Sequence, residues 1–183
     1  IPNLQSTTYY QGDKGDEVSD YSLNYQVGTT TIKNTSVFVY GTTFLRAISA
    51  GTELAMTRSL SYKTVEGVAK AIDSATDSFY DASGAIMDAD KLQSETYYYG
   101  SIRGDEIAHY AYNMRLGTTS VRNVSVYYYD DKTADETGVT TDTAMNMSKT
   151  FKTTSFSGKI DLTDPGIPNL QSTTYYQGDK GDE

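Results

Sequence analysis

The chain opens and closes with the same seventeen residues. Residues 1–17 read IPNLQSTTYYQGDKGDE, and residues 167–183 repeat this segment letter for letter. An identical segment at a spacing of 166 residues predicts a tandem period, so the chain holds one full period and the opening of the next. We therefore expect a window from a longer array. Arrays of similar modules stack unit upon unit, which favours a structural or adhesive role over catalysis.

A second, diverged duplication lies inside the period. Residues 4–40 return as residues 92–129 with one residue inserted near Ile102, and the match resumes between residues 55–64 and 144–153. Shared sequence within one chain predicts a shared fold for the two copies. The predicted units are module A at 1–91, module B at 92–169, and the first strand of a repeated module A at 170–183.

Only module A carries a helical pattern. Val65, Val68, Ala69 and Ile72 follow i, i+3, i+4, i+7 spacing, which predicts a short helix at about residues 65–76. Module B has TTSFSGKIDLTDPG in its place, which is typical of strand and turn.

Period-two alternation dominates the rest of the chain and predicts strands. In module A an alternating run, residues 21–27, ends at Gly28 and is followed by a second strand at 31–40, which together form a long hairpin. Module B repeats the hairpin around Gly117. Further strands are expected at 6–11, 44–50 and 54–63, with counterparts in module B. This pattern predicts an all-β fold of two antiparallel, immunoglobulin-like β-sandwiches in tandem.

Charge and composition exclude several classes of function. The net charge is −9 with a single histidine, so no basic stripe is available to neutralise nucleic-acid phosphates. The chain has no cysteine, which excludes disulfides, thiol catalysis and Cys-ligated zinc. No apolar run reaches the roughly 20 residues that span a bilayer, so we expect no membrane span in this window.

Acidic residues gather at predicted turns and module junctions, where carboxylates would suit Ca²⁺. No EF-hand loop or RTX repeat is present, and the alternative is that these are solvated turn carboxylates. The candidate ligands are Asp13, Asp16, Glu17, Asp88, Asp90, Asp130 and Asp131.

Three sequons predict glycosylation at Asn34, Asn123 and Asn146, although short sequons also arise by chance in chains rich in Ser and Thr. Asn34 and Asn123 fall at the same mid-strand position in the two modules.

Two further patterns have simpler explanations. Arg103-Gly104-Asp105 spells the integrin-binding tripeptide, but a tight turn explains it equally. Glu17, Asn34 and Lys63, repeated in module B, have the residue types of the Lys–Asn isopeptide crosslink, to which a plain surface lysine is the alternative.

No enzymatic constellation is repeated in the two modules. His109 is the only histidine, and Asp20 takes its place in module A, so a Ser-His-Asp arrangement is not supported. No GxGxxG or phosphate-loop pattern is present. We therefore expect no enzymatic activity.

In repeat architecture, Thr- and Tyr-rich strands, acidic balance and missing cysteines, the chain resembles the tandem β-sandwich arrays of prokaryotic surface adhesins, filaments and matrices. The resemblance implies an extracellular or cell-surface location and modules that join end to end with copies of themselves or with neighbouring repeats. The alternative is an adhesin module that binds glycans or a surface through exposed tyrosines and acidic loops.

The duplicated terminal strand predicts a way of joining. Alone it would present unpaired backbone groups, so we expect it to complete a sheet of a neighbouring module or subunit by strand addition. The residues expected to form this assembly strand include Leu170, Tyr175 and Tyr176.

Overall fold

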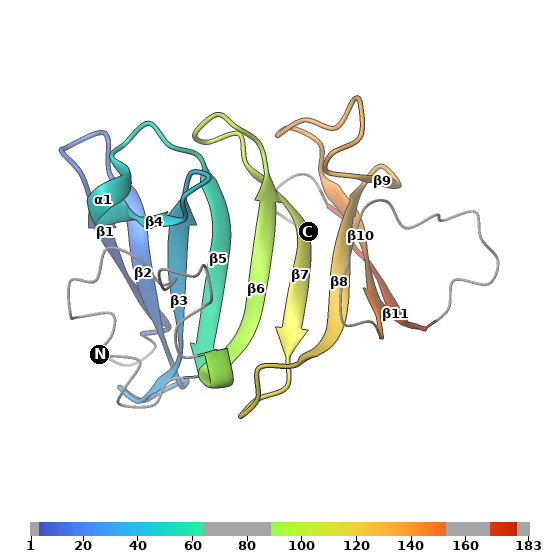
Figure 1. Cartoon of the computed structure of the whole chain (residues 1–183), viewed down its shortest axis with the longest axis horizontal. Coiled ribbons are helices and arrows are strands. Elements are labelled where there is room, and N and C mark those ends of the chain that lie inside the picture. The colour runs from blue at the N-terminus through green and yellow to red at the C-terminus, as the bar shows by residue number, and fades with distance from the viewer. Residues whose placement is uncertain (1–3, 64–88, 153–168, 179–183) are drawn as a thin grey trace.

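The computed structural model describes residues 4–63, 89–152 and 169–178, which form one antiparallel sheet of eleven strands (Figure 1). Two short helical segments accompany it, α1 at Ala47–Ala50 and the 3₁₀ turn η1 at Ala89–Lys91. The strands are β1 Ser6–Gln11, β2 Val18–Tyr25, β3 Ile32–Tyr40, β4 Leu45–Arg46, β5 Met56–Lys63, β6 Leu92–Tyr99, β7 Ile107–Met114, β8 Val121–Tyr129, β9 Lys132–Thr133, β10 Met145–Phe151 and β11 Leu170–Tyr175.

The strands lie side by side in chain order. The sheet runs β1-β2-β3-β5-β6-β7-β8-β10-β11, with β4 added at the end of β3 and β9 at the end of β8. We call β1–β5 the first half-repeat and β6–β10 the second half-repeat. Because β5 pairs directly with β6, the sheet continues without interruption from one half-repeat to the next.

The all-β, antiparallel prediction is confirmed, but the arrangement of two immunoglobulin-like sandwiches is not. Every strand in the described part of the chain belongs to a single sheet. Alternation in the sequence determines which side chains share a face. It does not determine whether a following hairpin stacks over the previous one or pairs with its edge, and here the hairpins pair edge to edge.

Most predicted strands appear within one or two residues of their expected bounds, and β1 matches the prediction at both ends. The strand predicted at 44–50 is wrong: only Leu45 and Arg46 are extended, and α1 follows at once. Ala47 and Ala50 of α1 pack with Val18 and Tyr40, and this packing favours a helical turn. The helix predicted at 65–76 lies outside the described residues.

One face of the sheet holds most of the apolar core. Cross-strand pairs such as Val37–Leu60 and Tyr110–Val126 place large apolar side chains on this face from one half-repeat to the next. Its two main clusters are Val37, Val39, Leu60, Tyr62 and Leu92, and Val124, Val126, Tyr128, Met147 and Phe151. The opposite face carries small polar residues over much of its area, among them Ser22, Asn24, Ser36, Ser94, Asn113, Ser125 and Thr150.

The two half-repeats share details that the sequence alone did not reveal. The Tyr40 hydroxyl donates to the Ser19 carbonyl at 2.5 Å, and the corresponding Tyr129 hydroxyl donates to the Ala108 carbonyl at 2.8 Å. The turns after β1 and β6 both require glycine. At Gly100, φ is 134° and a Cβ would lie 2.8 Å from the Asp105 carbonyl oxygen.

Among the helical segments that the structure describes, none has the length and apolar character needed to cross a membrane.

Candidate assembly interface

Strand β11 continues the sheet beyond the second half-repeat. It pairs antiparallel with β10, so the duplicated segment completes the sheet of the module that precedes it in the same chain. Backbone hydrogen bonds extend the ladder past both strand ends, from Tyr176 N to Asn146 O at 2.9 Å and from Lys152 N to Asn169 O at 2.7 Å. The Tyr176 hydroxyl also lies 3.1 Å from Ser148 Oγ.

The β10–β11 joint reproduces the β5–β6 joint residue by residue. Arg58 of β5 corresponds to Met147 of β10, and each stands opposite the first tyrosine of the next strand, Tyr97 and Tyr175. The shift in register also recurs at the same place, between the last two pairs of each ladder. The matching pairs are Arg58–Tyr97 with Met147–Tyr175, Leu60–Glu95 with Lys149–Thr173, and Tyr62–Leu92 with Phe151–Leu170.

The ladders inside the half-repeats recur in the same way. Tyr9 pairs with Tyr21 as Tyr97 pairs with Tyr110, and both ladders shift register directly after that pair. Because the internal ladders and the joints both repeat, one rule of strand addition generates the whole described sheet. The same rule predicts which strand belongs beside β1 and which belongs beside β11.

Stacked tyrosines join the first two strands of each half-repeat. The Tyr9 and Tyr21 rings stack at 4.5 Å between centroids, and the Tyr97 and Tyr110 rings stack at 4.5 Å. Tyr175 is the third member of this series, and it is 76% exposed because no β2-like strand lies beside β11 in the described chain. Leu170 is 43% exposed at the same edge.

The joint between the half-repeats carries a charge pair that the β10–β11 joint lacks. Arg58 Nη1 lies 2.9 Å from Glu95 Oε1, and its guanidinium carbon lies 4.5 Å from the Tyr97 ring centroid. Burial, with the neighbouring Tyr112, raises the pKa of Tyr110 to about 12, so its phenol stays neutral in this cluster. At the β10–β11 joint the corresponding residues are Met147 and Thr173, which are uncharged.

A glutamate from the β6–β7 turn adds a contact across the β5–β6 joint. Glu106 accepts from Gly104 N at 2.8 Å within its own turn and from Met56 N at 2.7 Å on β5. The corresponding Glu17 accepts from Gly15 N at 3.0 Å. Glu17 therefore repeats the turn geometry at the β1 edge.

The structure separates most of the predicted metal ligands. Asp13, Asp16 and Glu17 lie in the exposed β1–β2 turn, Asp130 and Asp131 lie in the β8–β9 turn, and Asp90 lies in η1. Within residues 4–63, 89–152 and 169–178, no group of three His, Cys, Asp or Glu side chains is placed to hold a metal ion. Asp88 lies outside these ranges.

The predicted glycosylation sites differ in exposure. Asn34 is half-buried, and its Oδ1 accepts from Asn24 Nδ2 at 2.7 Å. Asn123 is buried, and its Nδ2, the atom a glycan would modify, donates to Gln171 Oε1 at 3.0 Å. Asn146 is half-buried beside the β8–β9 turn and bonds to Asp131 at 3.3 Å. With Asn123 only 6% exposed, the described sheet leaves little room for a glycan on its Nδ2.

The structure also shows where the residues of the integrin-like tripeptide and of the Glu–Asn–Lys trio lie. Arg103 of the integrin-like tripeptide donates to the carbonyls of Thr52 at 2.9 Å and Glu17 at 3.0 Å, so its guanidinium is held within the molecule. Asn34 and Lys63 stand directly opposite each other on β3 and β5, whereas Glu17 lies at the other end of β2. The Glu–Asn–Lys trio is therefore not assembled.

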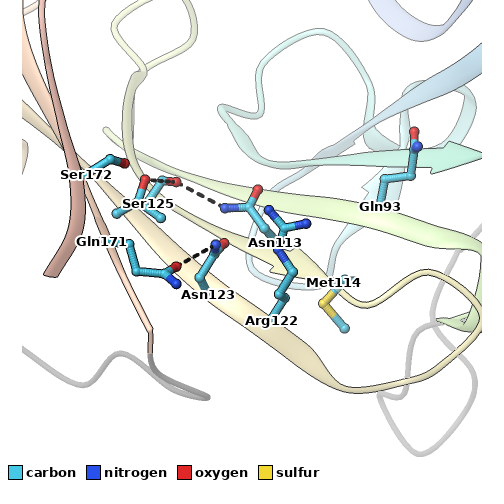
Figure 2. A pocket seen from close by; sticks show the side chains of 9 residues that line it. Gln93, Asn113, Met114, Arg122, Asn123, Ser125, Gln171 and Ser172 are labelled. Atoms are coloured by element: carbon cyan, nitrogen blue, oxygen red, sulfur yellow. Dashed lines mark hydrogen bonds between the residues drawn. The ribbon is translucent and has the colours of Figure 1, made fainter. Parts of the chain in front are cut away.

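A polar groove lies on the face opposite the apolar core and spans the β10–β11 joint (Figure 2). Its volume is about 610 Å³, and amides and hydroxyls from β6, β7, β8, β10 and β11 line it. In the first half-repeat Asn24 bonds to Asn34, but here Asn113 Nδ2 donates to Ser125 Oγ at 3.0 Å. Asn123 Oδ1 is consequently buried without a hydrogen-bond partner.

Sequence reasoning missed the charged residues of the joint. Glu95 corresponds to Thr7, and Arg58 corresponds to Met147, so both charges appear in the same joint and both disappear from the other. This paired change within one chain is the signal that could have placed β5 beside β6.

Comparison with protein-family models, with curated proteins and with solved structures gives no match to this chain.

Proposed function

We propose that the chain is part of an extracellular structural repeat protein whose half-repeats extend one β-sheet sideways into a filament, stalk or matrix. A single observation supports this proposal above all others: the β10–β11 joint has the register and the irregularity of the β5–β6 joint. A sheet in which each joint repeats the previous one has no intrinsic last strand. Each further period then adds length and leaves the same edge for its successor.

In this proposal the repeated unit is shorter than the period. Each half-repeat contributes four main strands, and the two kinds of joint alternate, one with the Arg58–Glu95 ion pair and one with the uncharged Met147 and Thr173 at the corresponding positions. Alternating joints discourage slippage by one half-repeat, because Arg58 opposite a β1-type strand would meet Thr7 in place of Glu95.

The test is a chain with two complete periods. Eight main strands per period at about 4.8 Å each add roughly 38 Å of sheet along the hydrogen-bonding direction, less any shortening by twist. Small-angle scattering is expected to show a maximum dimension that grows by about this amount while the cross-section stays constant. Equal growth in all directions, as for two packed globules, would contradict the proposal.

The alternative function is glycan binding, and the polar groove favours it through the unpartnered Asn123 Oδ1. Amides and hydroxyls that converge on a groove can hydrogen-bond sugar hydroxyls. A glycan array on the wild-type chain, with Asn113→Ala as the control, separates the two functions, because sheet extension predicts no glycan signal.

A further inference from the structure

We infer that the outer edge of β1, which has no partner strand in the described part of the chain, is a docking site for a second copy of this chain, which binds through its β10 edge in place of its own β11. This inference rests on the proposed sheet extension and adds that the extension also proceeds between separate molecules. The β10 edge of a second copy is the expected partner of β1 because residues 4–11 and 170–177 are identical. Strand β10 already binds that sequence.

The direction of the backbone groups identifies the docking edge. Tyr25 N donates to Gln5 O, so Gln5 and the alternate residue Thr7 point their backbone groups toward β2. Thr8 therefore points outward. In β11, Tyr176 N donates to Asn146 O, so the alternate residue Thr174 points toward β10. Because Thr174 is the copy of Thr8, the groups that β11 uses to bind β10 are the groups that β1 leaves free.

The register of the intermolecular joint follows from the β10–β11 ladder. Subtracting the period of 166 residues from each β11 partner gives the β1 partner. The expected pairs are Met147–Tyr9, Ser148–Thr8, Lys149–Thr7, Thr150–Ser6 and Phe151–Leu4. In the same joint Glu17 of one copy lies against Met145 N of the other, as Glu106 lies against Met56 N.

A second copy must compete with a strand that is already tethered. The chain's own β11 has an effective concentration in the millimolar range, so the wild-type chain is expected to remain monomeric at micromolar concentrations. Five of the six β11 residues, all except Thr173, are exposed, however, so the tethered strand buries little surface. A copy that presents β1 already paired with β2 brings an ordered edge.

The joint is head-to-tail. The surface used on one copy, the β1 edge, differs from the surface used on the other, the β10 edge. Such heterologous contacts form open filaments unless the rotation between copies closes a ring. Linear growth is therefore expected once β11 is displaced.

The experiment weakens β11 in the full chain with Thr174→Pro. Proline removes the N–H that points toward β10, and β11 lies at the end of the sheet, so the remaining strands stay paired. The weight-average mass in sedimentation equilibrium is expected to rise with concentration to roughly double the monomer value or more. The wild-type chain should stay near its monomer mass of 20.1 kDa under the same conditions.

The identical copy of the strand supplies the matched control. Thr8→Pro removes the outward N–H of β1 and the hydroxyl contact from Thr8 Oγ1 to Ser22 Oγ at 2.6 Å. The backbone ladder to β2 stays in place, so the single variant is expected to be a folded monomer. Thr8→Pro combined with Thr174→Pro should also be monomeric. Association of this double variant would overturn the inference, because another surface would then be responsible. So would a folded Thr174→Pro chain that stays monomeric throughout.

A crosslink tests the register without depending on the proline variants alone. The chain has no cysteine, so Thr7→Cys and Lys149→Cys can be placed in separate Thr174→Pro chains. Lys149 and Thr7 form a pair without mutual backbone hydrogen bonds, with Cα atoms about 4.5 Å apart, which suits a disulfide. Oxidation should yield the mixed dimer.

Thr8→Cys in place of Thr7→Cys is the register control, because its side chain lies on the other face and no crosslink is expected. Equal crosslinking of both would overturn the register. If two-period chains lengthen as proposed but these crosslinks do not form, extension is confined to one chain. If two-period chains fail to lengthen, the proposed function itself fails.

Discussion

At the scale of residues, the two half-repeats hold a polar side-chain pair at the same position with the acidic and the basic residue exchanged. Asp20 and Arg46 form an ion pair in the first half-repeat, with Arg46 Nε donating to Asp20 Oδ1 at 3.0 Å, and both residues are buried. The corresponding residues of the second half-repeat are His109 and Asp135, 3.3 Å apart and less buried. Each half-repeat therefore keeps a carboxylate beside a nitrogen donor at this position, in opposite order along the chain.

Removing one partner of the buried pair is expected to be costly. Arg46→Leu leaves the Asp20 carboxylate uncompensated in a site where it is 1% exposed, so the free energy of unfolding should fall by about 3–5 kcal/mol. Asp135→Asn is the matched control at the more exposed pair, with an expected loss of about 1 kcal/mol or less. Urea unfolding of both variants gives the comparison, and equal losses would contradict it.

The second pair predicts a dependence of stability on pH. Burial lowers the pKa of His109, and the attraction of Asp135 opposes this shift without reversing it. The unfolded chain therefore takes up the proton before the folded chain does. Stability should fall as the pH decreases below about 6.5, the ordinary histidine value.

His109→Gln should remove this part of the pH dependence. Carboxylates contribute their own slope at lower pH, so the quantity to measure is the difference in unfolding free energy between wild type and variant from pH 8 to pH 5. The difference is expected to change with acidification in the direction that disfavours wild type. A constant difference would show that His109 titrates alike in both states.

At the scale of elements, the sequence predicted strands well and their arrangement less well. Alternation placed β1 and β3 closely, because side chains on strands with one apolar face must alternate. The element at 44–50 was mispredicted as a strand, and Phe44 and Ile48 do have high strand propensity. Tertiary contacts favour the helical turn, since Arg46 turns inward to Asp20 and Ala47 of α1 packs against Val18 and Tyr40.

The joints predict a difference between two corresponding tyrosines. Tyr97 stacks on Tyr110 and lies under the Arg58 guanidinium, so Tyr97→Ala should lower the free energy of unfolding by about 3 kcal/mol. Tyr175 is largely exposed, and Tyr175→Ala should change it by no more than about 0.5 kcal/mol. In a chain with two periods a β2 strand would cover Tyr175, and the cost of Tyr175→Ala should then approach that of Tyr97→Ala. Thermal or urea unfolding of the four chains measures this.

At the scale of the whole molecule, the repeat predicted that similar units would adjoin but not how they would do so. The sandwich prediction assumed that each unit buries its apolar face against a second sheet of its own. The observed sheet places β5 beside β6, and Arg58 and Glu95 identify this joint because they occur together in it. The assembly strand was predicted as an element, and its partner β10 became evident only in the structure.

The identity of β1 and β11 has a consequence for how such a gene changes over time. When the strand that closes one period is the strand that opens the next, duplication or deletion of a whole period leaves every surviving contact of a kind already present. Unequal recombination between periods would then lengthen or shorten the product without demanding compensatory mutations elsewhere. The number of periods can therefore change without loss of these contacts, and natural variants are expected to differ in chain length by multiples of 166 residues.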